Sequence, residues 1–469
     1  MPELITEFDT VFHGGTVVTM DDHRRILVDG AVGVSGNRIA AVGPAAQLAN
    51  CDATRRIDCA GRIVMPGLID CHNHLYQIAG RGLGDGMALW QWLSDFMLPL
   101  SANISPIESL SAVRLGALEA LSSGTTTVVD NHYAPADVQT TLAVAAALRD
   151  VGLRGVVARG MFGPFTEVAR DNGLSDALFR HDIAHEIRTM RECLEQWEQG
   201  RVKIWPSPIN IIYNDQALVE QSIALADEFG VKWHTHCSEA KVDPDIYQRA
   251  YGSRPITWLD NQGLLDSNAT IAHAIWLDDA EIAAMGRHGA GVAHNPSSNA
   301  YLASGPIRLA ALRDAGAIVG LGADGAAGHS MDLFQIMKQT VYVQRLATLD
   351  PESSNAGVAL DLATREGARF AGVDAGQLSV GKLADIIVLS TDSPAWSPIF
   401  DVIASLVYSA IGRDVDLAMI DGKVVYEQRQ LMNADANAIR ADARQHCGAL
   451  IARLGLSGRT GVASPSTAA

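Results

Sequence analysis

The sequence has few cysteines, and none of them belongs to a C-x-x-C pair. Its 469 residues include 6 cysteines, at positions 51, 59, 71, 193, 237 and 447. This spacing argues against a zinc ribbon and against a thioredoxin-type redox site. In a chain of this length such cysteines are typical of reduced, buried thiols, and we therefore expect a cytoplasmic protein.

Long apolar runs and positive charge are also lacking. No apolar run reaches the length of a membrane span, and the first residues, MPELITEFDTVFHGG, have neither the basic nor the apolar region of a secretory signal. The chain carries 36 Lys and Arg against 53 Asp and Glu, a net charge of -17. This balance argues against nucleic acid and anionic membranes as partners, and we expect a globular enzyme that acts on a small molecule.

Two regions of short β segments and turns flank a longer middle region. Residues 1–65 contain DTVFHGGTVVTM and GAVGVSGNRIAAVG, and residues 376–440 contain GKLADIIVLS and VDLAMIDGKVVYE. These two regions could pair into one composite β domain. Residues 441–469 are expected to form a C-terminal helix and tail, with SGRTGVASPSTAA as a frayed end.

The middle region, residues 66–375, alternates apolar strand-like runs with helical runs. Strand candidates include GLIDCHNH, GTTTVVDNH, LRGVVARG, RVKIWPSP and VKWHTHCSE, and the pattern continues to AIVGLGADG. Repeated βα units of this kind predict an α/β fold with a parallel sheet. A TIM-type (β/α)8 barrel and an open doubly wound sheet would both produce this rhythm.

Two histidines, His72 and His74, close the first strand of the middle region. Side chains two residues apart on a strand point to the same face, so both imidazoles face the same way. A buried strand tends to exclude histidine unless something satisfies its polar atoms. The pair is therefore better explained as two ligands of one metal ion than as two core residues.

Polar side chains also close the later strands of the middle region. They are His234, His236 and Glu239 in HTHCSE, His273 in IAHAIW, His294 in AHNPSSN and Asp324 in LGADG. Imidazoles and carboxylates that meet at one barrel mouth suit a divalent cation of the zinc or iron type. Taken singly, His234 or His294 could be a hydrogen-bonded core residue and Asp324 a helix N-cap. The joint pattern favours the metal site.

Together, the segments PGLIDCHNHL, HTHCSE, IAHAIW, HNPSSNAYLASG, GADGAA and GQLSVGKLADIIVL resemble the amidohydrolase superfamily, and most of all its aminohydrolase branch. The resemblance implies a distorted (β/α)8 barrel with a small β-sandwich domain built from both termini. It also implies one divalent metal, Zn2+ or else Fe2+, held by His72, His74, His236 and Asp324. Binuclear members carry a lysine at the end of the fourth strand, whereas Lys203 lies near its start here, so the resemblance favours a mononuclear site.

The activity that this resemblance implies is hydrolytic deamination of an amino-substituted nitrogen heterocycle: a purine, pterin, pyrimidine or s-triazine. Asp324 would accept a proton from the attacking water, Glu239 would protonate the ring nitrogen, and His273 would stabilise the attacking oxygen. The alternatives are a triazine chlorohydrolase and an S-adenosylhomocysteine-type nucleoside deaminase. A non-catalytic scaffold would be expected to lose metal ligands, and here every expected position is filled.

Candidate substrate contacts are Gln77, Trp90, Trp92, Arg159, His294 and His329. The indoles could stack on a flat heterocycle, although Trp92 could instead pack under a short helix. Arg159 matches a family arginine, but WPSPINIIYND lacks the histidine that S-adenosylhomocysteine deaminases use for the nucleoside. We therefore expect a compact substrate without a ribosyl-homocysteine tail. We also expect a homodimer or a larger homo-oligomer.

Overall fold

The strands of the middle region close into a barrel in the computed structural model, which describes residues 7–325 and 327–456. The barrel strands are β6 (Leu68–His74), β7 (Thr125–His132), β8 (Arg154–Met161), β9 (Val202–Pro208), β10 (Trp233–Cys237), β11 (Ala269–His273), β12 (Gly291–His294) and β13 (Ile318–Leu321). Neighbouring strands are parallel within two sheets, of which one runs β6-β7-β8-β9 and the other β10-β11-β12-β13.

Two short pairings join these sheets into a ring. A parallel bridge between Asn210 and His236 joins the end of β9 to β10. The two-residue strand β14 (Asp324–Gly325) follows β13 and pairs in parallel with the end of β6, where Asp324 lies opposite Asn73. The ring excludes the open doubly wound sheet and confirms the predicted barrel.

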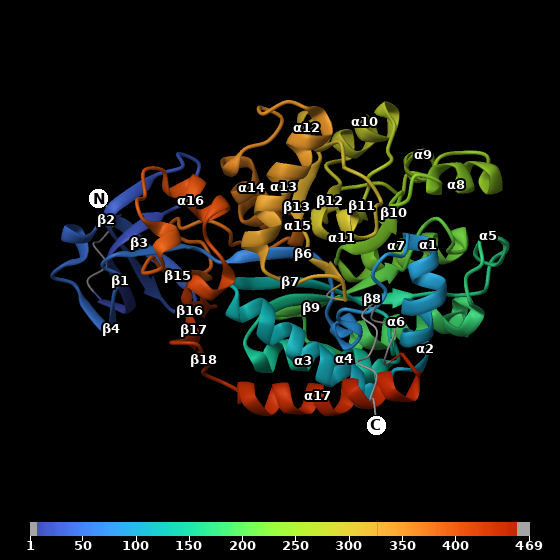
Figure 1. The fold of residues 1–469 in the computed structure, drawn as a ribbon, viewed down its shortest axis with the longest axis horizontal. Helices are drawn as coiled ribbons and strands as arrows, with labels where there is room; N and C mark the ends of the chain where they lie inside the picture. Colours follow the sequence, from blue (N-terminus) through green and yellow to red (C-terminus); the bar gives the residue numbers. More distant parts are fainter. Residues whose placement is uncertain (1–6, 326, 457–469) are drawn as a thin grey trace, which may run out of the picture.

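Helices alternate with the strands and surround the barrel (Figure 1). They are α3 (Pro106–Ser122), α4 (Val138–Val151), α6 (Ile183–Gln196), α7 (Gln216–Phe229), α9 (Pro255–Asn261), α10 (Asp279–His288), α12 (Leu309–Ala315) and α15 (Arg365–Ala371). Local chemistry sets their ends. At α10, Asp278 and Glu281 form a capping box and Gly289 ends the helix with a φ of 62°. Backbone donors at the start are thus satisfied, and glycine adopts the left-handed turn without strain.

Further helices lie in the connections and beyond the barrel. They are α1 (Leu89–Trp92), α2 (Leu98–Asn103), α5 (Glu167–Asp171), α8 (Asp243–Tyr251), α11 (Pro296–Tyr301), α13 (Leu333–Thr348), α14 (Ala356–Ala363), α16 (Val402–Tyr408) and α17 (Ala436–Arg453). Within the described residues, no helix combines the length and the apolar character needed to cross a bilayer.

Both ends of the chain build one further sheet beside the barrel, at the left of Figure 1. Its strands are β1 (Glu7–Val18), β2 (Ile26–Ser35), β3 (Arg38–Pro44), β4 (Asp52–Asp58), β5 (Arg62–Pro66), β15 (Ile386–Ser390), β16 (Val415–Ile420), β17 (Lys423–Glu427) and β18 (Gln430–Leu431). The order is β18-β17-β16-β15-β5-β1-β2-β3, with β4 paired to β1. Phe12 and Val32 from the first half share one apolar cluster with Ile386 and Leu417 from the second.

The predicted domain boundaries at residues 65, 375 and 440 stay a prediction. The α17 helix begins at Ala436 and lies along α3 (Figure 1), where Arg453 pairs with the buried Glu108 at 2.7 Å. The tail SGRTGVASPSTAA, expected to be frayed, lies outside the described residues.

A buried ion pair connects the barrel to the terminal sheet. The guanidinium of Arg154, the first residue of β8, donates from Nε to Asp385 at 2.7 Å and from Nη2 to Asp421 at 3.1 Å. Asp385 comes directly before β15 and Asp421 lies between β16 and β17. A single cation thus bridges two carboxylates contributed by the C-terminal half of the sheet.

We predict that Arg154→Met lowers the free energy of unfolding by about 3–5 kcal/mol, because the buried Asp385 carboxylate loses its cation. Urea unfolding would measure the change. The control is Arg191→Met, which breaks the exposed pair with Glu228 and should lower the free energy of unfolding far less. Equal effects of the two substitutions would contradict a special role for Arg154.

Candidate metal centre

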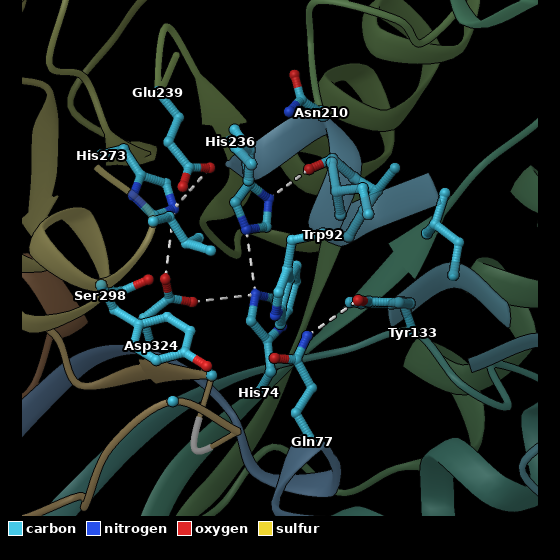
Figure 2. A pocket seen from close by; sticks show the side chains of 18 of the residues that line it. His74, Gln77, Trp92, Tyr133, Asn210, His236, Glu239, His273, Ser298 and Asp324 are labelled. Atoms are coloured by element: carbon cyan, nitrogen blue, oxygen red, sulfur yellow. Dashed lines mark hydrogen bonds and ion pairs between the residues drawn. The ribbon is translucent and has the colours of Figure 1, made fainter. Parts of the chain in front are cut away.

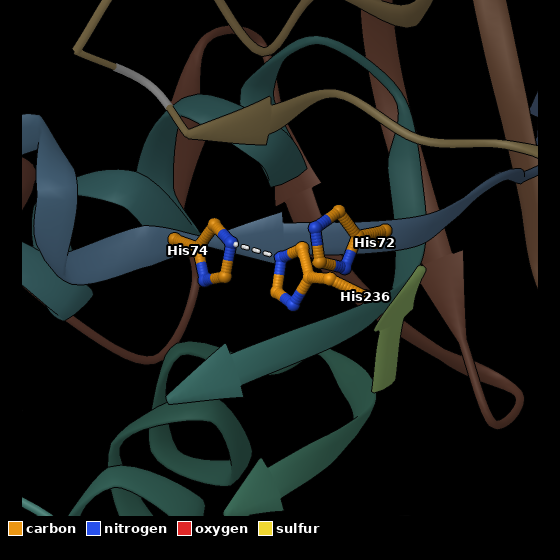
Figure 3. A group of neighbouring side chains, drawn as sticks. All are labelled: His72, His74 and His236. Atoms are coloured by element: carbon orange, nitrogen blue, oxygen red, sulfur yellow. Dashed lines mark hydrogen bonds between the residues drawn. The ribbon is translucent and has the colours of Figure 1, made fainter. Parts of the chain in front are cut away.

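Side chains from two barrel strands and from β14 meet at the carboxyl ends of the strands. Figure 3 shows His72 and His74 of β6 beside His236 of β10, and Figure 2 shows Asp324 of β14 facing His74. The Nε2 atoms of His74 and His236 are 3.1 Å apart, and Asp324 Oδ1 lies 3.2 Å from His72 Nε2. Ligand atoms about 2.1 Å from a tetrahedral metal lie about 3.4 Å from one another. The structure therefore brings together the four residues that the resemblance implied.

A chain of hydrogen bonds determines which nitrogen of His72 is free. Thr270 Oγ1 donates to the Trp233 carbonyl at 2.6 Å, so it accepts from His234 Nδ1 at 2.9 Å. The other nitrogen of His234 therefore carries a lone pair and accepts from His72 Nδ1 at 2.8 Å. This leaves a lone pair on His72 Nε2, which points at the centre and has no hydrogen-bond partner among the described residues.

His74 and His236 are oriented in the same way by backbone carbonyls. His74 Nδ1 donates to the Asn131 carbonyl at 2.7 Å, and His236 Nδ1 donates to the Ile209 carbonyl at 2.6 Å. Burial lowers the pKa of His74 to about 3 and that of His236 well below its usual value. Two Nε2 lone pairs thus face each other, an arrangement that repels unless a cation lies between them. These residues fit a divalent metal.

The fourth ligand candidate, Asp324, lies on a backbone that is held in an unusual conformation. Its φ is 60°, and the preceding Ala323 donates its N–H to Asp70 at 2.9 Å. Asp70 also accepts the N–H of His72 at 3.2 Å, so one buried carboxylate aligns the ends of β6 and β13. Burial by itself would raise the pKa of Asp324, and positive charge on the neighbouring imidazoles, or on a metal ion bound by them, lowers it well below its usual value. Asp324 is therefore an ionised ligand or proton acceptor.

Glu239 and His273 lie beside this centre. Glu239 Oε2 is 3.4 Å from His273 Nε2, whose second oxygen neighbour is Asp324 Oδ2 at 3.8 Å. Asn299 Oδ1 lies 2.9 Å from His273 Nδ1 and accepts its proton, which orients the ring. Burial raises the pKa of Glu239 well above its usual value, and the charges of Asp324 and Asp243 raise it further. The two shifts thus favour a protonated Glu239 beside an ionised Asp324.

A cavity opens over these groups (Figure 2). Of the predicted substrate contacts, Gln77, Trp92 and His329 line it. Gln77 donates from its amide nitrogen to the Tyr133 hydroxyl at 3.0 Å. Two buried polar atoms at the cavity, Gln77 Oε1 and Trp92 Nε1, have no hydrogen-bond partner in the described chain. Trp92 also packs edge-to-face on Phe96, so the expected packing role and a place in the cavity wall apply together.

The other three predicted contacts lie outside the lining of this cavity. Trp90 donates from Nε1 to Asp243 at 3.1 Å instead. Arg159 lies in the wall of a second cavity of about 510 Å³, where its guanidinium is 2.8 Å from the buried Glu186. His294 is 1% exposed, and both of its ring nitrogens lack a partner in the described chain. Trp90 and Arg159 contact carboxylates, and His294 is buried. The alternation of residues along a strand does not predict such contacts or such burial.

Sequence reasoning named His234 without a role at the centre and did not single out two tyrosines. His234 is buried and hydrogen-bonded, as one interpretation of the sequence had it, and from that position it orients His72. Tyr133 and Tyr213 line the cavity, and Tyr133 directly follows the end of β7. Residues that come just after barrel strands are placed at the mouth by the fold itself.

The fold and the site together define a metal-dependent barrel hydrolase, and the comparisons with known proteins give its family. Residues 63–425 match the model of the amidohydrolase family. The chain belongs to this family, as the resemblance indicated, and it is a hydrolase of the class that acts on C–N bonds.

Relatives of both predicted kinds, deaminases and a chlorohydrolase, occur among the similar proteins. A 5-methylthioadenosine/S-adenosylhomocysteine deaminase from Symbiobacterium thermophilum is 34% identical over 94% of this chain and 99% of its own. An adenosine deaminase from Xanthomonas campestris, solved with zinc, superposes with a TM-score of 0.88 at 27% identity over 96% of this chain and 100% of its own. A zinc-bound atrazine chlorohydrolase from Arthrobacter aurescens gives 0.85 at 27% identity over 93% and 100%. Hence the centre described above is a divalent-metal site.

We predict that the purified protein holds about one divalent metal ion per chain, and that His72→Ala and Asp324→Ala each remove it together with activity. The reason is that each change deletes one of four ligands. Metal analysis after dialysis would measure the occupancy. His288→Ala, which changes a surface histidine paired with Asp260, is the control that should keep the metal. Full occupancy in both ligand variants would show that the ligand assignment is wrong.

Proposed function

We propose that this chain is a hydrolytic deaminase that releases ammonia from an amino-substituted nitrogen heterocycle. The observation that carries the proposal is a pair of carboxyl groups, Glu239 and Asp324, that lie 3.4 and 3.8 Å from His273 Nε2 beside the candidate metal centre. Burial raises the pKa of Glu239 well above its usual value, and positive charge at the centre holds the pKa of Asp324 well below its own usual value. Deamination of a ring needs both a proton donor and a proton acceptor, and this pair supplies them.

A divalent metal bound by His72, His74, His236 and Asp324 supplies a Lewis acid that makes water acidic near neutral pH. The remaining steps belong to the protein. Asp324 Oδ2 can accept the proton of the attacking water. Glu239 lines the cavity, and its Oε1 has no hydrogen-bond partner within the described residues. This oxygen can donate a proton to a ring nitrogen of the substrate. The amine then leaves as ammonia after a second proton transfer.

His273 completes this arrangement. Its Nδ1 proton is committed to Asn299, so its Nε2 faces Glu239 and Asp324. Burial lowers the pKa of His273 to about 4, so the ring is neutral at rest and can take up a proton between the two carboxyl groups. This position supports the role of proton relay and stabiliser of the attacking oxygen.

Zinc is the metal we favour, with Fe2+ as the alternative. Three imidazoles and one carboxylate are a common zinc ligand set, and both of the solved relatives above were crystallised with zinc. Residues 72, 74, 236 and 324 come from one chain, so the centre does not require a partner subunit.

The expected cytoplasmic location and homo-oligomeric state stay predictions, and the free thiols of all six cysteines agree with a reducing compartment.

The substrate class we favour is an amino-heterocycle without an anionic tail. The relative from Symbiobacterium thermophilum is named for two nucleoside substrates, of which S-adenosylhomocysteine ends in an amino acid. In this chain the nearby cation Arg159 is already neutralised by Glu186, and its Nε donates to the Ala136 carbonyl at 2.7 Å. A substrate carboxylate would have to displace the buried Glu186 and leave it unpaired, which is costly.

The test of the proposed function is a screen for ammonia release by the zinc-loaded enzyme. We expect turnover of amino-purines, amino-pterins, amino-triazines or 5′-methylthioadenosine, and a kcat/KM for S-adenosylhomocysteine at least roughly tenfold lower. Chloride is measured in parallel with chlorotriazines. Preferred turnover of S-adenosylhomocysteine would contradict the tail argument, and chloride without ammonia would establish the dehalogenase instead.

We predict that Glu239→Gln lowers kcat by roughly 10²–10⁴-fold with the metal retained, because glutamine keeps the shape but has no acidic proton. Ammonia release and metal content measured on the same preparation would separate the two effects. Glu228→Gln, an exposed carboxylate on α7, should match the wild type. A near-normal rate in Glu239→Gln would move the acid role to His273.

A further inference from the structure

The segment that covers the cavity is built as a flap. Three glycines, Gly82, Gly84 and Gly86, each have a φ of 80° just before α1. Only glycine adopts this left-handed backbone without strain, and a side chain at Gly82 or Gly86 would meet nothing within 4 Å. No side-chain packing therefore fixes these two points, and Gly82 is held by a backbone hydrogen bond, from its N–H to the Ala327 carbonyl at 2.8 Å. The short helix that follows contributes Leu89 and Trp92 to the cavity wall. Movement of residues 82–92 about the glycines would open or close the cavity.

One side chain outside the cavity lining connects this flap to the turn that carries Glu239. Asp243 Oδ1 accepts the indole N–H of Trp90 at 3.1 Å, and its Oδ2 accepts the backbone N–H of Ala240, the residue after Glu239, at 2.9 Å. The backbone N–H of Asp243 also donates to the Ala240 carbonyl at 3.0 Å. The carboxylate is 1% exposed, so both contacts are made away from water. A charge-assisted hydrogen bond in such a place is strong.

We propose that Asp243 is a positioning residue that latches the flap, residues 82–92, onto the turn of the catalytic acid through Trp90. Closing the flap and aiming Glu239 then become one event, because the same carboxylate binds both segments. The kinetic part of this inference rests on the proposed deaminase function. The structural part, a latch between two segments, does not.

The first test removes the indole donor and keeps an aromatic ring, with Trp90→Phe in the zinc-loaded full-length protein. Hydrogen exchange followed by mass spectrometry should show at least about tenfold faster exchange in the peptide that covers residues 82–92. The matched control is Trp396→Phe, because the Trp396 indole also donates to a carboxylate, Asp414 at 3.0 Å, and both residues belong to the C-terminal region beyond the barrel. It should leave this peptide unchanged. Unchanged exchange in Trp90→Phe would overturn the latch without bearing on deamination.

The second test is a double-mutant cycle on the compound that the wild type deaminates fastest. Asp243→Asn must lose one of its two contacts, because an amide nitrogen cannot accept a hydrogen bond. We expect Trp90→Phe to raise KM about tenfold, and Asp243→Asn to lower kcat as well because the turn of Glu239 loosens. The double variant should be no worse than Asp243→Asn. Additive losses, or a change in KM alone for Asp243→Asn, would overturn the coupling. A wild type that releases no ammonia would instead refute the proposed function.

Discussion

Two imidazole nitrogens that both lack a proton face each other at 3.1 Å, and most of the site follows from that constraint. The protons of His74 and His236 are held on the opposite ring nitrogens by backbone carbonyls at the ends of neighbouring segments. The rings cannot turn away without breaking those bonds. The barrel therefore holds a repulsive arrangement in place, and a divalent cation is the species that converts the repulsion into attraction.

Burial produces opposite effects on the neighbouring acids and bases. Removal from water disfavours charge, so it lowers the pKa of the imidazoles and raises that of Glu239. Asp324 is the exception, because it faces the centre where a cation would lie, and positive charge there stabilises its carboxylate. One desolvated cavity can thus hold a neutral acid and an ionised carboxylate within the same cluster. The proposed chemistry requires these two states together.

The rest of the fold serves to keep strand ends in register. Asp70 binds backbone N–H groups at the ends of two strands that are distant in sequence, which places His72 and Asp324 side by side. Arg154 ties the first half of the barrel to the sheet built from both termini. The loops above the barrel can then vary and set the substrate specificity. The flap, residues 82–92, and the walls of the second cavity are two such regions.

The barrel could be predicted from the sequence because it rests on local rules, and the resemblance indicated the family and implied the four residues that meet at the barrel mouth. Alternation along a strand puts His72 and His74 on one face, and parallel βα units bring the carboxyl ends of strands to one mouth. The destinations of Trp90, Arg159 and His294 could not be predicted. Asp243 and Glu186, which engage the first two, lie 153 and 27 residues further along the chain, respectively. Which partner a long polar side chain reaches is decided by packing between loops, and only the tertiary structure brings those partners within hydrogen-bonding distance.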